Sequence, residues 1–213
     1  MLDVHIILGA PKTEKIKMQL KSDGFIIGVD GGAEFALEES IQLDLAIGDF
    51  DSVSSLNALE VKKHAKKILN FPSKKDDTDA ELALLYVKEH IEAGKIYIYN
   101  WYGGRLDHLQ SIMMIPLQAR FQSLLSKIQF VSKKNTVNYY SPGQYELVKE
   151  EKMDYLSLIL LSEIKDLSLN KVVYPIKNKD YPSPRALISN EFENQKAKMS
   201  FKEGKILIIQ SRD

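Results

Sequence analysis

The sequence contains no cysteine, which excludes both a disulfide framework and a thiolate metal site. It also lacks an excess of charge of either sign, because 29 Lys and Arg residues balance 29 Asp and Glu residues. A neutral chain whose lysines occur only in short runs provides no broad basic surface for nucleic acid. We therefore expect no nucleic-acid partner, although one local site could still bind a small anion.

Long hydrophobic runs are absent as well. The N-terminal segment MLDVHIILGAPK carries an acidic residue and an apolar run only as long as a strand, which fits neither a signal peptide nor a membrane span. We expect a cytoplasmic protein with no membrane partner. The 213 residues, 44% of them hydrophobic, have an ordinary globular composition and suffice for one large domain or two small ones.

The first part of the chain, residues 1–122, alternates strand-like and helix-like segments. Nearly continuous apolar runs, typical of strands buried on both faces, occupy 4–10, 25–30, 45–50 and 95–100. Helical patterns occupy 33–40, 54–65, 78–93 and 106–121. This alternation predicts an α/β domain, a mainly parallel sheet flanked by helices.

Residues 126–213 have a different pattern. Short strand candidates (KIQFVS, TVNYY, QYELV, YLSLILL, AKMSF and KILIIQ) are separated by turn-like segments (SPGQ, KNKDYPSP and KEGK). Ala197, Met199 and Phe201 alternate with lysine and serine, as in a half-solvated antiparallel strand. We expect a second, all-β domain, a sandwich or rolled sheet.

Polar and glycine residues collect where the predicted strands of the first domain end. In parallel sheets, ligands bind at the carboxyl ends of the strands. The segments concerned are GVDGGAEF (28–35), GDFDS (48–52), KKDDTDAE (74–81) and NWYGGRLDH (100–108).

GDFDS places Asp49 and Asp51 on the same side of an extended backbone. Two carboxylates this close require a compensating cation, and hard oxygen ligands suit Mg²⁺. The alternative is that Asp51 or Ser52 caps the following helix, which accounts for one carboxylate at most. An EF-hand is excluded because no calcium-loop continuation follows.

KKDDTDAE contains a capping-box pattern in Thr78 and Glu81, which is a purely structural explanation for part of its charge. Three aspartates in four residues exceed what a cap requires, and on a helix Asp76 and Asp79 would share a face.

GGRLDH combines glycines, whose backbone N–H groups can approach an anion, with Arg105, whose guanidinium suits phosphate oxygens. A simple turn is the alternative explanation for the glycines of GGRLDH and for those that follow Asp30. The chain has neither a P-loop nor a complete GxGxxG fingerprint. Together, the acidic and glycine–arginine segments match the requirements of a Mg²⁺–nucleoside triphosphate site.

In their order and spacing, DGGAEFALE, LAIGDFDSV, FPSKKDDTDAELAL and GGRLDH resemble the motifs of the thiamine pyrophosphokinase family, and VVYPI…ALISNEF (172–192) resembles its C-terminal substrate signature. The resemblance implies transfer of the diphosphoryl group of ATP to the hydroxyl of thiamine, giving AMP and thiamine diphosphate. It also implies an α/β domain followed by a β-sandwich, and a homodimer with its active site at the subunit interface.

Carried over by position, the resemblance implies Mg²⁺ ligands at Asp49, Asp51 and Asp79. It implies ATP contacts at Asp30, Gly31, Gly32, Lys75, Gly103, Gly104, Arg105 and His108. The catalytic set would be the three metal ligands with Arg105 and Asp107. The general base stays open between Asp79 and Asp107. Thiamine contacts are implied at Ser189, Asn190 and Phe192.

Two segments depart from the family pattern. Trp101 and Tyr102 stand before GGR where smaller or aliphatic residues are expected. Trp101 is the sole tryptophan, so a ring from the second domain that stacks on thiamine must belong to another residue. Phe192 is the nearest candidate, although it also fits a core position. The proline-rich segment DYPSPRAL leaves Arg185 without a role.

Three rival interpretations remain. DFDSV satisfies the DxDx[TV] pattern of haloacid-dehalogenase-type phosphatases, with Asp49 as nucleophile, although those enzymes carry the motif on their first strand. A related pyrophosphokinase could act on a pterin or another small alcohol, and the SNEF region would then differ in its contacts. A nucleotide sensor would bind Mg²⁺–ATP without turnover.

Overall fold

The computed structural model describes residues 1–11, 15–49, 60–61, 63–72 and 76–213. The chain divides into two compact units, Met1–Lys133 and Lys134–Asp213. No helix of the described residues is long and apolar enough to span a membrane.

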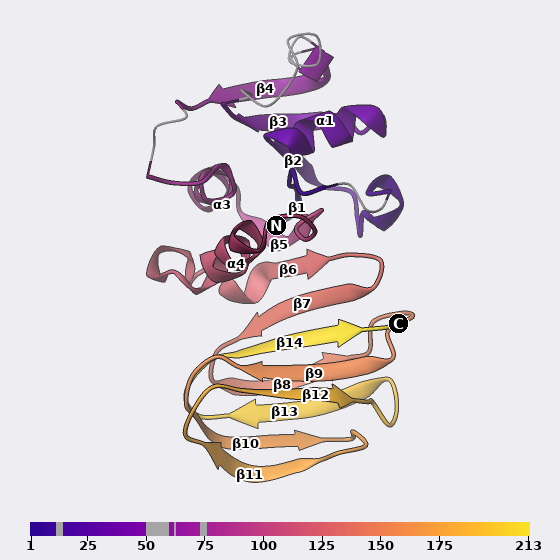
Figure 1. The fold of residues 1–213 in the computed structure, drawn as a ribbon, viewed down its shortest axis with the longest axis vertical. Helices are drawn as coiled ribbons and strands as arrows, with labels where there is room; N and C mark the ends of the chain where they lie inside the picture. The colour runs from indigo at the N-terminus through magenta and orange to yellow at the C-terminus, as the bar shows by residue number, and fades with distance from the viewer. Residues whose placement is uncertain (12–14, 50–59, 62, 73–75) are drawn as a thin grey trace. The chain divides into compact units, whose positions relative to one another are not determined.

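The first unit is built on a parallel sheet with strand order β6-β5-β1-β2-β3-β4 (Figure 1). Its neighbouring strands all pair in parallel. The strands are β1 (Leu2–Ile7), β2 (Phe25–Val29), β3 (Leu43–Gly48), β4 (Ala65–Asn70), β5 (Ala93–Tyr99) and β6 (Ile128–Val131).

Helices lie on both faces of this sheet. From β2 the chain passes through α1 (Gly31–Glu38) outward to β3, whereas α3 (Asp79–His90) returns it from β4 to β5 on the other side of β1. Right-handed crossovers in opposite directions place the two helices on opposite faces. Helix α4 (Leu106–Met114) continues in the same direction as α3 and lies on the same side (Figure 1). The predicted α/β architecture is therefore confirmed.

Three details of this unit differ from the sequence prediction. Strand β4 was not predicted, because the lysines of AKKILN hide its apolar pattern; it is an edge strand, where lysines are common. Ala65 begins this strand instead of ending a helix, and most of the predicted helix 54–65 lies outside the described residues. Helix α4 stops at Met114, because Pro116 follows in a 3-10 turn and cannot continue the α-helical hydrogen bonds.

The second unit is an antiparallel β-sandwich, as predicted. One layer pairs in the order β12-β9-β14-β7 and the other in the order β11-β10-β13-β8. The strands are β7 (Asn135–Tyr140), β8 (Gly143–Val148), β9 (Tyr155–Leu160), β10 (Ile164–Asn170), β11 (Ile176–Tyr181), β12 (Arg185–Asn190), β13 (Lys196–Phe201) and β14 (Ile206–Ser211).

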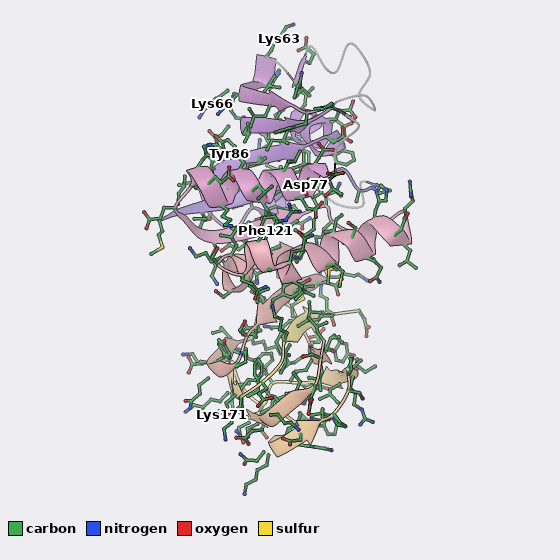
Figure 2. The ribbon with its side chains drawn as sticks, turned by 90° about the vertical axis from the view of Figure 1, so that its left-hand side faces the viewer. Lys63, Lys66, Asp77, Tyr86, Phe121 and Lys171 are labelled. Carbon is green, nitrogen blue, oxygen red and sulfur yellow. The ribbon has the colours of Figure 1, made fainter. Side chains whose placement is uncertain are left out.

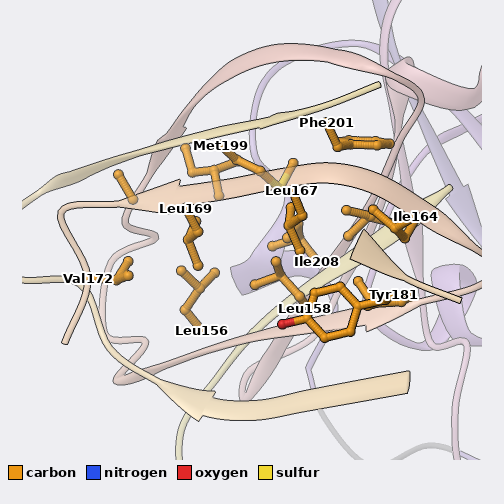
Figure 3. Packing of buried hydrophobic residues seen from close by; sticks show 14 of the residues in the cluster. Leu156, Leu158, Ile164, Leu167, Leu169, Val172, Tyr181, Met199, Phe201 and Ile208 are labelled. Carbon is orange, nitrogen blue, oxygen red and sulfur yellow. The ribbon is translucent and has the colours of Figure 1, made fainter. Parts of the chain in front are cut away.

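Side chains from both layers form the core of the sandwich, shown from close by in Figure 3. On β13 the expected alternation holds, since Ala197, Met199 and Phe201 are buried and the lysines between and before them are exposed. The core also includes Leu156, Leu158, Ile164, Leu167, Leu169 and Ile208. Burial of this apolar surface is the main force that joins the layers.

Segments of the second half also differ from expectation. The predicted turn KNKDYPSP contains most of β11, an edge strand whose polar side chains face solvent and conceal its period. Strands β10 and β12 were not predicted either. The segment KIQFVS, assigned from sequence to residues 126–213, forms β6, which pairs with β5 in the first unit.

Candidate active site

The carboxyl ends of β1, β2, β3 and β5 meet at one edge of the parallel sheet, because neighbouring strands run in the same direction. The DGG turn follows β2, Asp49 follows β3, and the GGR loop follows β5. The sequence motifs therefore share the edge that was predicted for them.

Asp30 and Asp49 lie on adjacent strand ends. The Asp30 N–H donates to the carbonyl of Ile47 at 2.8 Å. A Cβ atom on Gly48 would come within 3.1 Å of the Asp30 Cα, so glycine at this position lets the turn after β2 approach β3 closely. Asp30 itself has φ of 47° and ψ of −122°, a positive-φ conformation that is uncommon for residues other than glycine. This packing holds Asp30 against Gly48, the residue before Asp49.

Gly32, the second glycine after Asp30, has a structural task. A Cβ atom on Gly32 would lie 2.0 Å from the Ile7 carbonyl oxygen, so only glycine allows α1 to start this close to β1. Gly32 is buried, whereas Gly31 is half-buried. Close approach of backbone segments thus explains Gly32 without a ligand.

Helix α3 begins at Asp79, and Thr78 caps it. The Thr78 Oγ1 accepts from the Glu81 N–H at 3.3 Å, and the Glu81 Oε2 accepts from the Thr78 N–H at 2.8 Å, which confirms the capping box. Asp76 lies before the helix, so the expectation that Asp76 and Asp79 share a helical face is wrong. The cap fixes Asp79 in the first turn of α3.

Asp77 and Glu81 are both bound by Arg120, a residue that the sequence analysis did not single out. The Arg120 Nη2 lies 2.7 Å from Asp77 Oδ1 and 2.9 Å from Glu81 Oε1. Gln118 also donates to Glu81 Oε1, at 2.6 Å. Asp77 lies just before α3. Arg120 and Phe121 belong to the neighbouring 3-10 turn, and Figure 2 shows where Asp77 and Phe121 lie.

This network sets the charge state of both acids. The hydrogen bond from Arg120 lowers the pKa of Asp77. Burial raises the pKa of Glu81, but hydrogen bonds from Gln118 and Thr78 and the charge of Arg120 outweigh it, so the pKa is lowered overall. Both groups are therefore ionised at neutral pH. No sequence pattern indicated this, because Arg120 lies 39 positions from Glu81.

Arg105 and Asp107 form an ion pair at the start of α4. The Arg105 Nε and Nη2 donate to the two carboxylate oxygens of Asp107 at 3.1 and 2.5 Å. The hydrogen bond from Arg105 lowers the pKa of Asp107 to about 2. Asp107 also accepts from the His108 N–H at 3.0 Å. A carboxylate this acidic is a weak proton acceptor, but it holds the guanidinium in a fixed direction.

The departure at Trp101 has a structural explanation. Its side chain is buried, its Nε1 donates to the Val131 carbonyl at 3.2 Å, and its ring packs edge-on against Phe130. Trp101 therefore anchors the GGR loop to β6. Asn100 directly precedes Trp101 and was not among the site residues predicted from the sequence. An asparagine at a strand end near glycines is nevertheless a recognisable turn signal.

In the second unit, the candidate residues have different surroundings. The Asn190 side chain accepts from the Tyr174 N–H at 3.0 Å and donates to the Tyr174 carbonyl at 2.9 Å. Ser189 is exposed, with φ of 58°, and donates through its N–H to Ser157 Oγ. Phe192 is only 8% exposed and belongs to the sandwich core.

A cavity of about 270 Å³ lies beside Asn190. Its walls are mostly apolar, and the Tyr174 side is open to solvent, since this residue is 65% exposed. The lining also includes Pro175, Ile188, Leu158 and Tyr181.

Two predicted site residues, Asp51 and Lys75, lie outside the described residues. Within the described ranges, which omit Asp51, no three His, Asp or Glu side chains are grouped so that they could hold a metal ion.

Comparison with known proteins decides the family. The sequence matches the family description "Thiamin pyrophosphokinase, catalytic domain" over residues 16–128 and "Thiamin pyrophosphokinase, vitamin B1 binding domain" over 144–206. It is 31% identical over 217 residues to the thiamine pyrophosphokinase of Bacillus subtilis strain 168, with full coverage of both chains. The chain belongs to the thiamin pyrophosphokinase family.

Solved structures agree with this membership. A thiamin pyrophosphokinase family protein from Enterococcus faecalis matches with a TM-score of 0.89 and 33% identity, covering 99% of each chain. Thiamine pyrophosphokinase from Bacillus subtilis matches with a TM-score of 0.86 and 28% identity, also covering 99% of each chain. Membership of this family does not favour the interpretation of DFDSV as a phosphatase motif. It also does not favour a pyrophosphokinase that acts on a pterin or another small alcohol.

Proposed function

We propose that the protein transfers the diphosphoryl group of ATP to the hydroxyl of thiamine, releasing AMP and forming thiamine diphosphate. The observation that carries the proposal is the shared carboxyl edge. There Asp30 and Asp49 follow the neighbouring strands β2 and β3, and β1 separates β2 from β5, the strand that leads into the GGR loop. Acidic groups for a cation and a glycine–arginine loop for phosphates are what Mg²⁺–ATP requires.

Mg²⁺ is the cation that we propose for this edge, held by Asp49, Asp51 and Asp79. Their carboxylates are the hard oxygen donors that Mg²⁺ prefers, and no cysteine is present to favour a softer metal. When bound, the ion would neutralise phosphate charge and stabilise the charge that develops in the transition state. We do not include Asp77 among the proposed Mg²⁺ ligands, because its carboxylate forms an ion pair with Arg120.

Arg105 and the amides of Gly103 and Gly104 would hold triphosphate oxygens, with Asp30, Gly31, Gly32, Lys75 and His108 completing the ATP contacts. Asp107 would orient Arg105 through their ion pair, so that the guanidinium points at the phosphates when ATP binds. The thiamine hydroxyl would then attack the β-phosphorus in line. The hydroxyl proton would pass to Asp79 or Asp107, and the hydrogen bond from Arg105 makes Asp107 a weaker proton acceptor by lowering its pKa.

Thiamine would bind in the second unit, near Ser189 and Asn190. Asn190 supports the turn at Tyr174 through its two hydrogen bonds, and the exposed Tyr174 ring offers a surface for stacking. We propose Tyr174 as the aromatic contact in place of Phe192, because the Phe192 side chain is packed in the core. We further propose a homodimer in which two subunits complete each active site, and a cytoplasmic location.

The test is incubation of the protein with ATP, Mg²⁺ and thiamine, followed by separation of the nucleotide and thiamine products. We expect AMP and thiamine diphosphate in equal amounts. ADP together with thiamine monophosphate would overturn diphosphoryl transfer. Release of inorganic phosphate with a trapped aspartyl-phosphate at Asp49 would instead indicate phosphatase chemistry.

A further inference from the structure

The loop that follows β1, residues Leu8–Pro11, connects the two sides of the candidate ATP site. We refer to it as the β1 loop. The Leu8 N–H donates to the Tyr99 carbonyl at 3.0 Å. A Cβ atom on Gly104 would lie 2.9 Å from Pro11 Cγ, and one on Gly9 would lie 3.2 Å from the Gly31 Cα. The β1 loop therefore touches both the GGR loop and the DGG turn.

Asn100 binds this loop with its side chain. Its Nδ2 donates to the carbonyls of Leu8 at 2.8 Å and of Ala10 at 2.6 Å. The Asn100 backbone is left-handed, with φ of 52°, which glycine adopts without strain. The asparagine side chain is therefore not required by the backbone conformation, and its specific contribution is the pair of hydrogen bonds.

The contact lies at the switch point of the sheet. From β1 the chain builds the sheet toward β2, β3 and β4, whereas β5 and β6 lie on the other side of β1. Loops leaving β1 and β5 consequently diverge to opposite faces, and the crevice between them is where open α/β sheets bind ligands. Asn100 ties these two loops together across that crevice.

We infer that Asn100 is a positioning residue for ATP and that the β1 loop backbone at Gly9 and Ala10 forms part of the nucleotide site. The two hydrogen bonds fix the separation between the GGR loop, on one side, and the DGG turn, on the other. They also occupy two carbonyl oxygens, whose negative partial charge would repel phosphates nearby. This inference rests on the proposed function for the identity of the nucleotide.

The test compares Asn100→Gly with Asn178→Gly. Asn178, on β11, is also left-handed, with φ of 46°, and its side chain donates to Asp166 Oδ1, so the same change is made in a matched setting. Trp101 is the sole tryptophan and directly follows Asn100, so its fluorescence can follow titration with Mg²⁺–ATP. Calorimetric titration gives the same dissociation constant without an optical probe.

For Asn100→Gly we expect a dissociation constant and a KM for ATP that rise about tenfold, as the loss of two hydrogen bonds implies, and a KM for thiamine that stays within about twofold. Asn178→Gly should leave the ATP values unchanged. Asn100→Asp should weaken ATP binding more than Asn100→Gly does. It keeps the shape of the side chain but places a carboxylate against two carbonyl oxygens. Circular dichroism and thermal melting verify that each variant folds.

The outcomes separate this inference from the proposed function. A wild-type protein that binds ATP but makes no thiamine diphosphate, with weaker ATP binding in Asn100→Gly, would refute the function and support the role of Asn100. Unchanged ATP binding in a folded Asn100→Gly variant would overturn the positioning role. An equal rise in the KM for ATP and for thiamine would do so too, and a wild-type protein that binds no ATP would overturn both proposals.

Discussion

The two units of the protein use their motif residues differently. In the first unit the motifs stand on loops after parallel strands, and several of their side chains are exposed, including Arg105, Asp107 and His108. In the second unit, Asn190 and Phe192 are buried and participate in the fold. Motif residues on loops after parallel strands can therefore stay exposed, whereas those on the strands of a sandwich also have to fill its core.

The largest effect that would test this difference is expected from Asp49→Asn in the first unit. Loss of one proposed Mg²⁺ ligand should reduce kcat by about a thousandfold, while the melting temperature stays near the wild-type value. Steady-state assays and thermal melts give both quantities. Asp23→Asn is the matched control, because Asp23 precedes β2 at the opposite edge of the sheet. Near-normal turnover in Asp49→Asn would remove this residue from the metal site.

A pair of variants tests the same contrast within the second unit. Phe192→Ala should lower the free energy of unfolding by roughly 3 kcal/mol, because it leaves a cavity in the core. Tyr174→Ala should raise the KM for thiamine about tenfold with little loss of stability, since its ring is exposed. Denaturant unfolding and substrate titrations measure the two effects. If Phe192→Leu raised the KM for thiamine while Tyr174→Ala did not, the stacking role would return to Phe192.

Arg120→Met tests whether the ion-pair network at the start of α3 contributes to the stability of the first unit, to its activity, or to both. The change leaves Asp77 and the buried Glu81 without their cation and should cost about 2 kcal/mol of stability. Because these acids flank Asp79, we also expect a higher Mg²⁺ concentration for half-maximal activity. Lys196→Met, which breaks the exposed pair with Glu146, should change stability by less than about 1 kcal/mol and is the control. Equal losses in the two variants would contradict a structural role for the network.

The smallest predicted effect concerns pH and a buried histidine away from the strand ends that carry the motifs. His5 Nδ1 lies 3.1 Å from the Tyr99 hydroxyl oxygen, which also accepts from the Lys21 N–H at 3.3 Å. Burial lowers the pKa of His5 from its ordinary value of 6.5, although Asp3 and Asp23 favour the charged form.

Folding therefore favours neutral His5, and its contribution to stability is complete above pH 6.5. It decreases as the pH falls from 6.5 toward the lower folded-state pKa, by about 1 kcal/mol per pH unit. Denaturant unfolding of wild type and His5→Asn between pH 7.5 and 5 measures this slope, with His90→Asn on the exposed end of α3 as control. An identical slope in wild type and His5→Asn would refute the assignment.

The fold was predictable where the apolar pattern is strong and hidden where charge interrupts it. Strand β14 begins with four consecutive Ile and Leu residues, and β1 buries Val4, Ile6 and Ile7, so an apolar run identifies both strands. Edge strands β4 and β11 carry lysines on their exposed faces, which removes the periodic signal.

For the site, the sequence alone determined which segments are candidates, because glycine and aspartate after parallel strands have few explanations other than turns and ligands. It could not determine which side chains remain for a ligand. Asp77 pairs with Arg120, Phe192 enters the core, and Asn100 binds carbonyls 90 and 92 positions away. Hydrogen bonds and packing between residues this distant in the chain arise only when the sheet assembles, so the tertiary structure decided them.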